Sequence, residues 1–466
     1  MNMSFRRARL ITAGSVLLAG AVLIADGTRF SDFTPLTASA GPTANEAMPI
    51  ALGSPDFQQL SIVDRQSQLL LSRPNSGSFD MITTNEAGPH KGRYLFTVFE
   101  TGTPGVQRHD LWTGETETIW QTPNSGAGHR SFDPSYWTPW GTFITAEENW
   151  TTAAAGSTSP YGRLFELRNP IDAPGIINPV TASSNAGADF VHRNVIPRTA
   201  HEGIQFDKAG NMYFIDELDG GNIYKYTPKA NWGQIMAGKA EYFDAGQTFV
   251  LRVGDGNTPN ATGPYVWVPI TNVTGVGLPG TITITDTSGV TSLDARNTTN
   301  LAPFKGTDYQ RPEDMVLQFV GGNEFLYVTT TTTHEVYRLD LHTDNIALFV
   351  SRNTIDLATG NAVGPQFTNP DNLAVDHDGN VYIVEDRNGG QDDDIWFAVD
   401  LNLDGDLNDP GEGIKRWASN GTSGSEFTGL YFDPTNKRRA WVNIQHPNSG
   451  NDRTIEITIP GGQNIR

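Results

Sequence analysis

Apolar and polar residues alternate with a period of two along many short stretches of this chain, and Gly- and Asn-rich turns separate these stretches. This alternation is typical of half-buried β-strands. No segment shows a long 3.6-residue periodicity, so we expect little helix. The strand–turn–strand units lie at 94–120, 138–150, 201–227, 311–350, 369–400 and 426–459.

Three of these units share a finer pattern, which predicts the fold. Each has an acidic residue, alternating apolar residues, a Gly/Asn turn, a Tyr-containing strand and a further Tyr- or Phe-containing strand. Repeats of a small sheet on this scale predict an all-β protein, a β-propeller with six blades, seven being the alternative. We expect one propeller domain over 61–466, with a linker at 41–60 before it. Residues 228–310 break the rhythm and are interpreted as a long insertion.

The composition agrees with a large β-domain. The chain has 466 residues, 37% of them hydrophobic, with 49 Gly and 28 Pro. A chain of this length can bury a sizeable core, and abundant turn residues favour many short strands. There is no cysteine, which excludes thiolate metal sites.

Residues 1–40 predict an export signal. Arg6, Arg7 and Arg9 form a basic region, residues 10–25 are apolar, and Ala38, Ser39 and Ala40 give a small-residue cleavage pattern. The arginine pair permits the twin-arginine route to the periplasm or the extracellular space. The alternative is an uncleaved N-terminal anchor.

The chain is acidic, with a net charge of −20, and removal of residues 1–40 leaves 28 basic and 50 acidic residues, a net charge of −22. Such a surface repels nucleic acid and suits cations. We therefore expect no nucleic-acid partner. We also expect a monomer without stable membrane insertion once the signal is removed.

Two segments, HEGIQFDKAGNMYFIDE and NPDNLAVDHDGNVYIVED, place acids symmetrically about a turn. Glu202 and Asp216 lie 14 residues apart, as do Asp371 and Glu385. An antiparallel hairpin would set each pair opposite one another, with Cβ atoms roughly 5 Å apart. Facing like charges are destabilising unless a cation lies between them, so the segments predict a metal ion with hard oxygen ligands.

Further acids stand at strand starts and ends, notably Glu147, Glu148 and Glu313. If the units are successive blades, the starts of their innermost strands meet at one end of the central channel. The acids would then converge on one point, where Ca²⁺, Mg²⁺, Mn²⁺ or Fe³⁺ would bind. The alternative is that each acid caps a turn or lies on a solvated rim.

Arg311 precedes Glu313 by two residues, on the same side of a strand. It could clamp a phosphate or carboxylate with two hydrogen bonds, or simply pair with Glu313.

A separate feature is the segment 400–412, DLNLDGDLNDPGE. Its polar residues match the start of an EF-hand-like loop: Asp400, Asn402, Asp404 and Asp406. Position 12 is Gly411, and Glu412 follows one place late. We expect a structural calcium loop, with a polar turn as the alternative. No HExxH, GxSxG or P-loop motif occurs.

Six segments occur in the order TPWGTFITAEEN, HEGIQFDKAGNMYFIDE, RPED, NPDNLAVDHDGNVYIVEDR, EFTGLYFDP and WVNIQHP. In these segments the chain resembles the PhoX-type alkaline phosphatases, over roughly residues 90–450. The resemblance implies a six-bladed propeller with a calcium–iron cluster in its channel, twin-arginine export, and hydrolysis of phosphomonoesters, hence a small phosphorylated substrate. By motif, Glu202, Glu313 and strand-end acids would bind metal, and Arg311 would hold the phosphate.

The chain departs from the family's pattern at one position. The family carries an iron-binding cysteine a few residues before TPWG, where this chain has SFDPSYW and Asp133 falls at about the equivalent place. Asp133 could supply an oxygen ligand instead, favouring calcium over iron. A calcium-stabilised hydrolase of another class, such as a lactonase-like enzyme, and a non-enzymatic extracellular binding protein are the alternatives.

Overall fold

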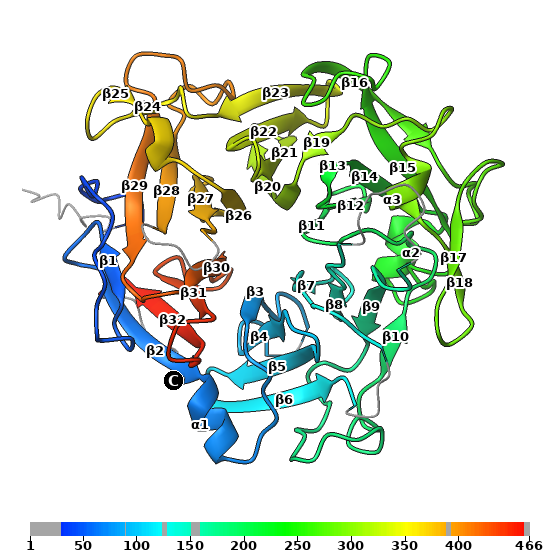
Figure 1. The fold of residues 1–466 in the computed structure, drawn as a ribbon, viewed down its shortest axis with the longest axis horizontal. Coiled ribbons are helices and arrows are strands. Elements are labelled where there is room, and N and C mark those ends of the chain that lie inside the picture. The colour runs from blue at the N-terminus through cyan, green and yellow to red at the C-terminus, as the bar shows by residue number, and fades with distance from the viewer. Residues whose placement is uncertain (1–28, 89, 124–127, 151–158, 388–392, 461–466) are drawn as a thin grey trace, which may run out of the picture.

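The computed structural model describes residues 29–88, 90–123, 128–150, 159–387 and 393–460. Within these residues the strands form six antiparallel blades around a central axis (Figure 1), which confirms the predicted propeller. The innermost strands of neighbouring blades contact one another. The chain therefore brings the start of every blade to the same central region.

The first three blades, each from its innermost strand outward, are as follows. Blade 1 has β3 (Phe79–Thr84), β4 (Tyr94–Phe99), β5 (Gly105–Asp110) and β6 (Glu115–Gln121). Blade 2 has β7 (Tyr136–Trp137), β8 (Phe143–Ala146), β9 (Leu164–Leu167) and β10 (Phe190–His192). Blade 3 has β11 (Ile204–Phe206), β12 (Met212–Ile215), β14 (Ile223–Pro228) and β15 (Gly246–Val253).

The remaining blades follow the same order. Blade 4 has β20 (Pro312–Val320), β21 (Asn323–Thr330), β22 (Glu335–Asp340) and β23 (Asn345–Val350). Blade 5 has β26 (Pro370–Val375), β27 (Val381–Glu385), β28 (Asp394–Val399) and β29 (Gly413–Asn420). Blade 6 has β30 (Glu426–Phe432), β31 (Arg439–Gln445), β32 (Arg453–Thr458) and, from the other end of the chain, β2 (Gln58–Asp64).

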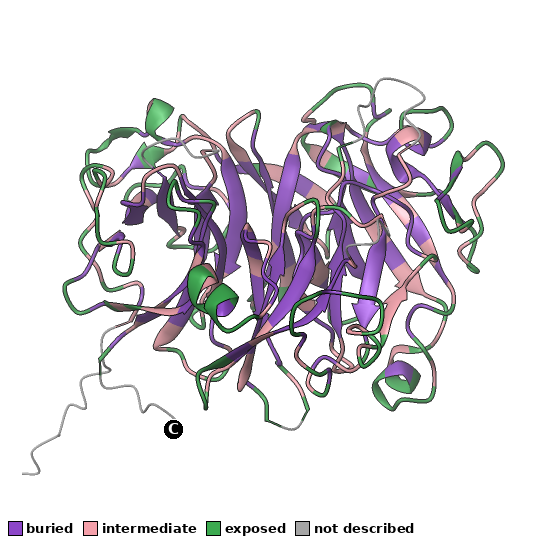
Figure 2. Ribbon diagram, turned by 60° about the horizontal axis from the view of Figure 1, so that its bottom comes forward, coloured by how far each residue is buried: buried purple, intermediate pink, exposed green. Residues whose placement is uncertain are grey.

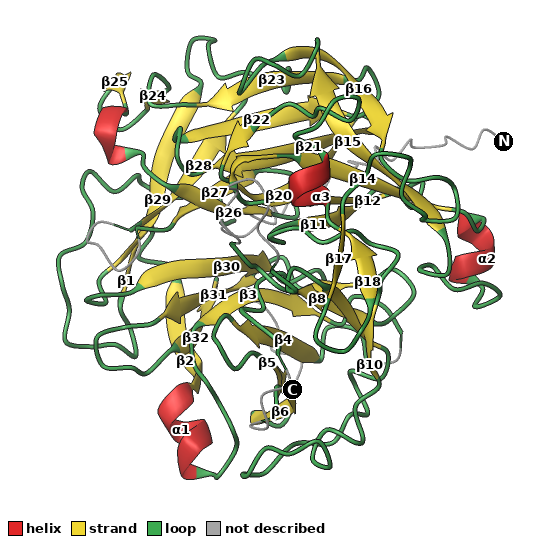
Figure 3. Cartoon of the chain, turned by 45° about the vertical axis from the view of Figure 1, so that its right-hand side comes forward, coloured by secondary structure: helices red, strands yellow, loops and turns green. Residues whose placement is uncertain are grey.

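Helices are short and lie outside the blades (Figure 3). They are α1 (Arg65–Leu70), α2 (Trp232–Met236), α3 (Ala295–Thr298) and the 3₁₀ turn η1 (Gly364–Gln366). Small strand pairs decorate the rim: β13 (Asp219–Gly221) with β19 (Tyr309–Gln310), β17 (Thr283–Thr285) with β18 (Thr291–Leu293), and β24 (Ile355–Asp356) with β25 (Asn361–Ala362). Among the described residues no helix has the length and apolar character needed to cross a membrane.

The core consists of apolar layers between neighbouring blades, so both faces of the central strands are buried (Figure 2). Strand β27 shows how the period-two pattern does this. Tyr382 packs into a cluster shared with blade 6, and the next residue, Ile383, packs into a cluster shared with blade 4. Successive side chains point to opposite faces, so one strand serves two layers.

The ring is closed by pairing the first part of the chain with the last. Strand β2 is hydrogen-bonded to β32, and β1 (Ile50–Leu52) adds to β29 of blade 5 (Figure 1). The stretch 41–60, expected as a linker, therefore contains β1 and the start of β2. A propeller closed in this way needs its N-terminal strand to complete the last blade.

The segment before β1 also packs on the propeller. Phe30 is 3% exposed and lies against Phe57, Trp417 and Phe432, and its carbonyl accepts a hydrogen bond from Trp417 Nε1 at 3.0 Å. Residues 29–40, expected within the export signal, thus contribute to the core. The basic region, with Arg6, Arg7 and Arg9, lies outside the described residues.

The stretch 228–310, interpreted as an insertion, holds β15, the rim strands β17 and β18, helices α2 and α3, and β16 (Gly263–Pro269). Strand β16 pairs with β15 on one side and with β23 on the other. It therefore joins blades 3 and 4 into one continuous sheet.

Candidate active site

At or just before the start of each of the six innermost strands, one acid faces the middle of the ring. These residues are Asp80, Asp133, Glu202, Glu313, Asp371 and Glu426. All six line a cavity of about 360 Å³ in the middle of the ring. Each of the six blades thus places an acid at its start, and the six acids surround the central axis.

A second set of acids stands one or two residues after the end of the second strand of four blades. These residues are Glu100, Glu148, Glu217 and Asp386, and they line the same cavity. Blade 6 offers Gln445 and His446 at that position, and Arg311 precedes the innermost strand of blade 4. Among the described residues that line the cavity, ten carboxyl groups thus face two basic side chains.

The sequence could not decide which member of each acidic pair faces the cavity. In the pair at the end of β8, Glu148 lines the cavity, while Glu147 does not. Glu147 is fully buried and pairs with Arg163, whose Nη2 lies 2.7 Å from Oε1. Adjacent residues of an extended chain point to opposite sides, so Glu147 is corrected from candidate ligand to partner of a buried arginine.

The same correction applies to Asp216 and Glu385, since their neighbours Glu217 and Asp386 line the cavity instead. Asp216 Oδ1 accepts a hydrogen bond from the Ala200 amide at 2.9 Å. Glu385 Oε1 accepts one from Trp396 Nε1 at 3.0 Å. Both acids therefore accept hydrogen bonds within the protein beside the cavity and do not line it.

The hairpin geometry expected for Asp371 and Glu385 does not form, whereas the pairing of blade 3 ends at Ile204 and Phe214, before it reaches Glu202 and Asp216. In blade 5 the register shifts between Pro370 and Leu373, so that Pro370 rather than Asp371 lies opposite Glu385. A β-bulge of this kind turns the strand and re-aims its side chains. Asp371 therefore faces the acids of other blades across the cavity.

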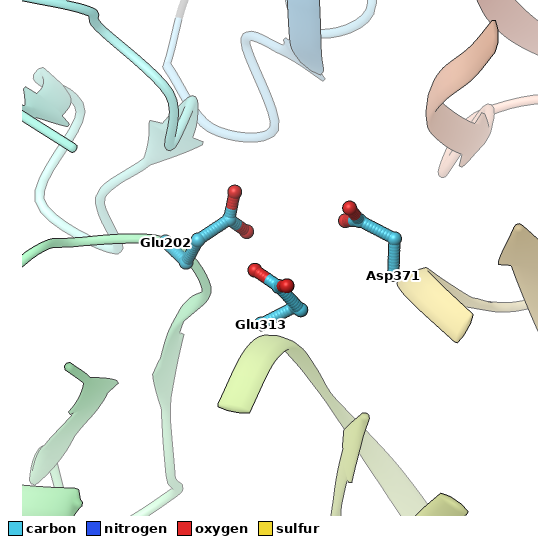
Figure 4. A group of neighbouring side chains, drawn as sticks. All are labelled: Glu202, Glu313 and Asp371. Atoms are coloured by element: carbon cyan, nitrogen blue, oxygen red, sulfur yellow. The ribbon is translucent and has the colours of Figure 1, made fainter. Parts of the chain in front are cut away.

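Glu202, Glu313 and Asp371 form the tightest group. Each offers a carboxylate oxygen, and the three oxygens lie within 4.8 Å of one another (Figure 4). The three residues come from blades 3, 4 and 5 and are all buried. Buried oxygens without a hydrogen-bond partner include Glu202 Oε2, Glu313 Oε2, Asp133 Oδ1 and Glu426 Oε2. Unsatisfied buried carboxylate oxygens are costly, and a bound cation would satisfy them.

The raised pKa values of these carboxyl groups also indicate a cation site. Burial, followed by the charges of Asp133 and Asp371, raises the pKa of Glu202 well above its usual value. Burial also raises the pKa of Glu313 to about 7, although Arg311 opposes the shift. Arg311 does not balance the charge of these groups, and a multivalent cation among them would lower the pKa of each.

Arg311 is held on one side of the cavity. Its Nη2 lies 2.7 Å from Glu217 Oε1 and 2.9 Å from Glu313 Oε1. Its Nε has no partner among the described residues. Arg311 therefore pairs with Glu313, as one of the two sequence interpretations predicts, and binding of an anion by Arg311 stays a prediction.

On the opposite side, Gln445 bridges two of the acids that sequence reasoning missed. Its Nε2 donates to Asp80 Oδ2 at 3.2 Å and to Glu100 Oε2 at 2.9 Å. The neighbouring His446 Nε2 pairs with Glu426. These two polar side chains organise the acids of blades 1 and 6.

The acids that sequence reasoning missed, Asp80, Glu100 and Glu426, had a sequence signal. Each stands at the start of an innermost strand or directly after a second strand, as the identified acids do. Applied to every unit, that rule would have found them.

The candidate calcium loop lies away from the cavity, between β28 and β29. Its polar side chains hydrogen-bond within the loop: Asn402 Nδ2 to Asp404 Oδ2 at 2.9 Å, and the Asn408 amide to Asp406 Oδ1 at 2.9 Å. Asp400 keeps one buried oxygen, Oδ1, without a partner. Calcium binding by this loop stays a prediction.

A second cavity of about 560 Å³ is lined by later residues of the same innermost strands. Its lining is largely apolar, with residues such as Ile204, Val316 and Leu373. The acidic cavity, where unpaired carboxylates converge, is therefore the candidate active site.

The fold and the cavity define a six-bladed propeller protein with a buried, multi-carboxylate site of the kind that binds hard cations. The chain belongs to the alkaline phosphatase PhoX family, whose model matches residues 136–448. It is thus a phosphatase, an enzyme of the phosphoric monoester hydrolase class, and enzymes of this family are metal-dependent and exported.

A solved structure shares the fold, and a second one has a lower similarity. Pseudomonas fluorescens PhoX in complex with vanadate, a transition state analogue, has a TM-score of 0.61 at 15% identity, covering 92% of this chain and 98% of that one. A gluconolactonase from Xanthomonas campestris, XC5397, has a TM-score of 0.41 at 11% identity, covering 92% and 97%. No curated protein matches the sequence.

Proposed function

We propose that this chain is an exported phosphatase that hydrolyses phosphomonoesters at a metal cluster held by the central carboxylates. The observation that carries the proposal is the meeting of Glu202, Glu313 and Asp371, with oxygens within 4.8 Å of one another, beside Arg311. Membership of the family indicates the class of reaction, and we propose that the reaction takes place at these three carboxylates and Arg311.

The residues present fit hard metal ions. The donors are carboxylate oxygens, several of them buried without a partner, and this donor set favours Ca²⁺. Asp133 lines the cavity and the chain has no cysteine, so any Fe³⁺ here would also have oxygen ligands. When bound, the ions would supply Lewis-acid charge next to the phosphoryl group.

The protein's own groups then position the substrate. The Arg311 guanidinium, whose side chain is 22% exposed, would donate to a phosphate oxygen, while Glu217 and Glu313 fix one side of it. The surplus of carboxylates disfavours a phosphate until cations are bound. Substrate binding should therefore follow metal binding.

The test compares Arg311→Ala with Arg93→Ala in metal-loaded protein. Arg93 is a matched control, because its side chain is 21% exposed against 22% for Arg311 and pairs with Asp110 away from the cavity. We expect kcat/KM for an aryl phosphate to fall by about 100-fold in Arg311→Ala, as for the loss of a transition-state donor. Arg93→Ala should keep wild-type activity. Equal activity in both variants would contradict the role of Arg311.

The arginine pair Arg6–Arg7 supports export by the twin-arginine route, which delivers folded, metal-loaded protein. Replacing both arginines by lysine should retain the protein in the cytoplasm, as seen by cell fractionation. Unchanged export would point to another route.

A further inference from the structure

A tryptophan lies at the edge of the acidic cavity, where it contacts two of the residues that line it. Trp150 follows the pair that ends blade 2's second strand, and its side chain is 44% exposed. Its ring lies against the guanidinium of Arg311, with Cζ 4.7 Å from the ring centroid. An exposed indole that stacks on an arginine beside a cavity of carboxylates indicates a role at the site.

The indole also makes a polar contact in the same place. Trp150 Nε1 donates to Glu217 Oε2 at 2.6 Å, and Glu217 Oε1 accepts from Arg311 Nη2 at 2.7 Å. The three side chains therefore form a closed triangle, in which Trp150 holds the arginine through its ring face and holds the arginine's carboxylate partner through its N–H.

This triangle adds a restraint to an arginine that two carboxylates already hold on one side. Arg311 stands on a left-handed backbone, with φ of +52°, and its neighbours Glu217 and Glu313 both attract its charge. The indole face blocks one side of the guanidinium plane, and a planar cation over an indole is a favourable contact. The guanidinium is thereby kept with Nε unpaired.

We propose that Trp150 is a positioning residue that orients Arg311 for binding the phosphoryl group of the substrate. The inference rests on the proposed function and names a residue that the family's motif acids do not include. Trp150 acts through Arg311 and Glu217.

The test uses Trp150→Ala, Trp150→Phe and a control in the same chain. Trp112→Ala is the control, because Trp112 is 49% exposed and lies 4.6 Å from Cζ of Arg93, which pairs with Asp110. Inorganic phosphate is titrated calorimetrically into each metal-loaded protein, and metal content is measured by mass spectrometry.

We expect Trp150→Ala to raise the Kd for phosphate about tenfold, with metal content unchanged, since an orienting contact and a hydrogen bond are lost together. Trp150→Phe keeps a ring face and loses the N–H, so its Kd should lie between those of the alanine variant and the wild type. Trp112→Ala should bind like the wild type.

A double-mutant cycle separates positioning from a general structural effect. In an Arg311→Ala background, Trp150→Ala should change phosphate binding no further, because its effect passes through the missing guanidinium. Additive effects, wild-type affinity in Trp150→Ala, or loss of metal in that variant would each overturn the inference. Wild-type protein that binds metal without binding phosphate would overturn both the inference and the proposed function.

Discussion

Replacing Glu202 with glutamine should change the stability of the protein with opposite signs in the absence and presence of metal. The ligand oxygens of Glu202, Glu313 and Asp371 lie within 4.8 Å of one another. At that separation and an effective dielectric constant of about 20, two like unit charges repel by about 3.5 kcal/mol. Glu202 takes part in two of the three pairs, and the glutamine amide can donate to either neighbour.

Protonation relieves part of this repulsion, because burial and neighbouring charges raise the pKa of Glu202 and burial raises that of Glu313 to about 7. At pH 8 in chelator, we therefore expect Glu202→Gln to raise the free energy of unfolding by about 1–3 kcal/mol. With Ca²⁺ the wild type gains stability by mass action, and the variant, lacking a ligand, should gain less.

Thermal unfolding in EDTA and in CaCl₂, with metal content measured in parallel, tests this expectation. Asp216→Asn is the matched control: Asp216 is buried in the same blade but hydrogen-bonds to the Ala200 amide outside the cavity. Its response to calcium should equal that of the wild type. A Glu202→Gln protein that is less stable in EDTA and responds to calcium like the wild type would refute the reasoning.

Two further predictions concern the core and the pH response. Phe30→Ala should cost about 3–5 kcal/mol of unfolding free energy, the range for deleting a buried aromatic side chain, whereas Leu70→Ala, at 86% exposure, should change the melting temperature little; equal shifts would mean that the segment 29–40 does not pack as described. A carboxyl whose folded-state pKa is raised loses its stabilising effect as pH rises, so metal-free protein should lose stability between about pH 4.5 and 7 as Glu313 ionises. Calorimetry across that range checks the sign, and saturating Ca²⁺ should reverse it, because the metal prefers ionised ligands.

The fold was largely predictable, because a propeller repeats one local pattern. In β27, for example, Tyr382 and Ile383 pack into different apolar layers, and this alternation is visible in the sequence as a period of two. Ring closure was not predictable in this way. Pairing of β2 with β32 and burial of Phe30 join distant parts of the chain, and local periodicity contains no information about such contacts.

The sequence predicts where the acidic pairs of the candidate site lie, but not which acid of each pair faces the cavity. The sequence placed acids at blade entries and strand ends, and Asp133, Glu148, Glu202, Glu313 and Asp371 do line the cavity. The choice within each pair depends on backbone detail at the strand end. The bulge in β26, for example, moves Pro370 opposite Glu385 and turns Asp371 toward the other blades.

The central claim is that the carboxylate cluster holds the metal ions that make this propeller a phosphatase. The most direct measurement is turnover of 4-nitrophenyl phosphate by one preparation of folded protein, first stripped with EDTA and then reloaded with Ca²⁺ and iron. The account predicts that chelation abolishes turnover, that reloading restores it, and that Glu313→Gln prevents the recovery. Turnover that survives full chelation, or none from metal-loaded folded protein, would contradict it.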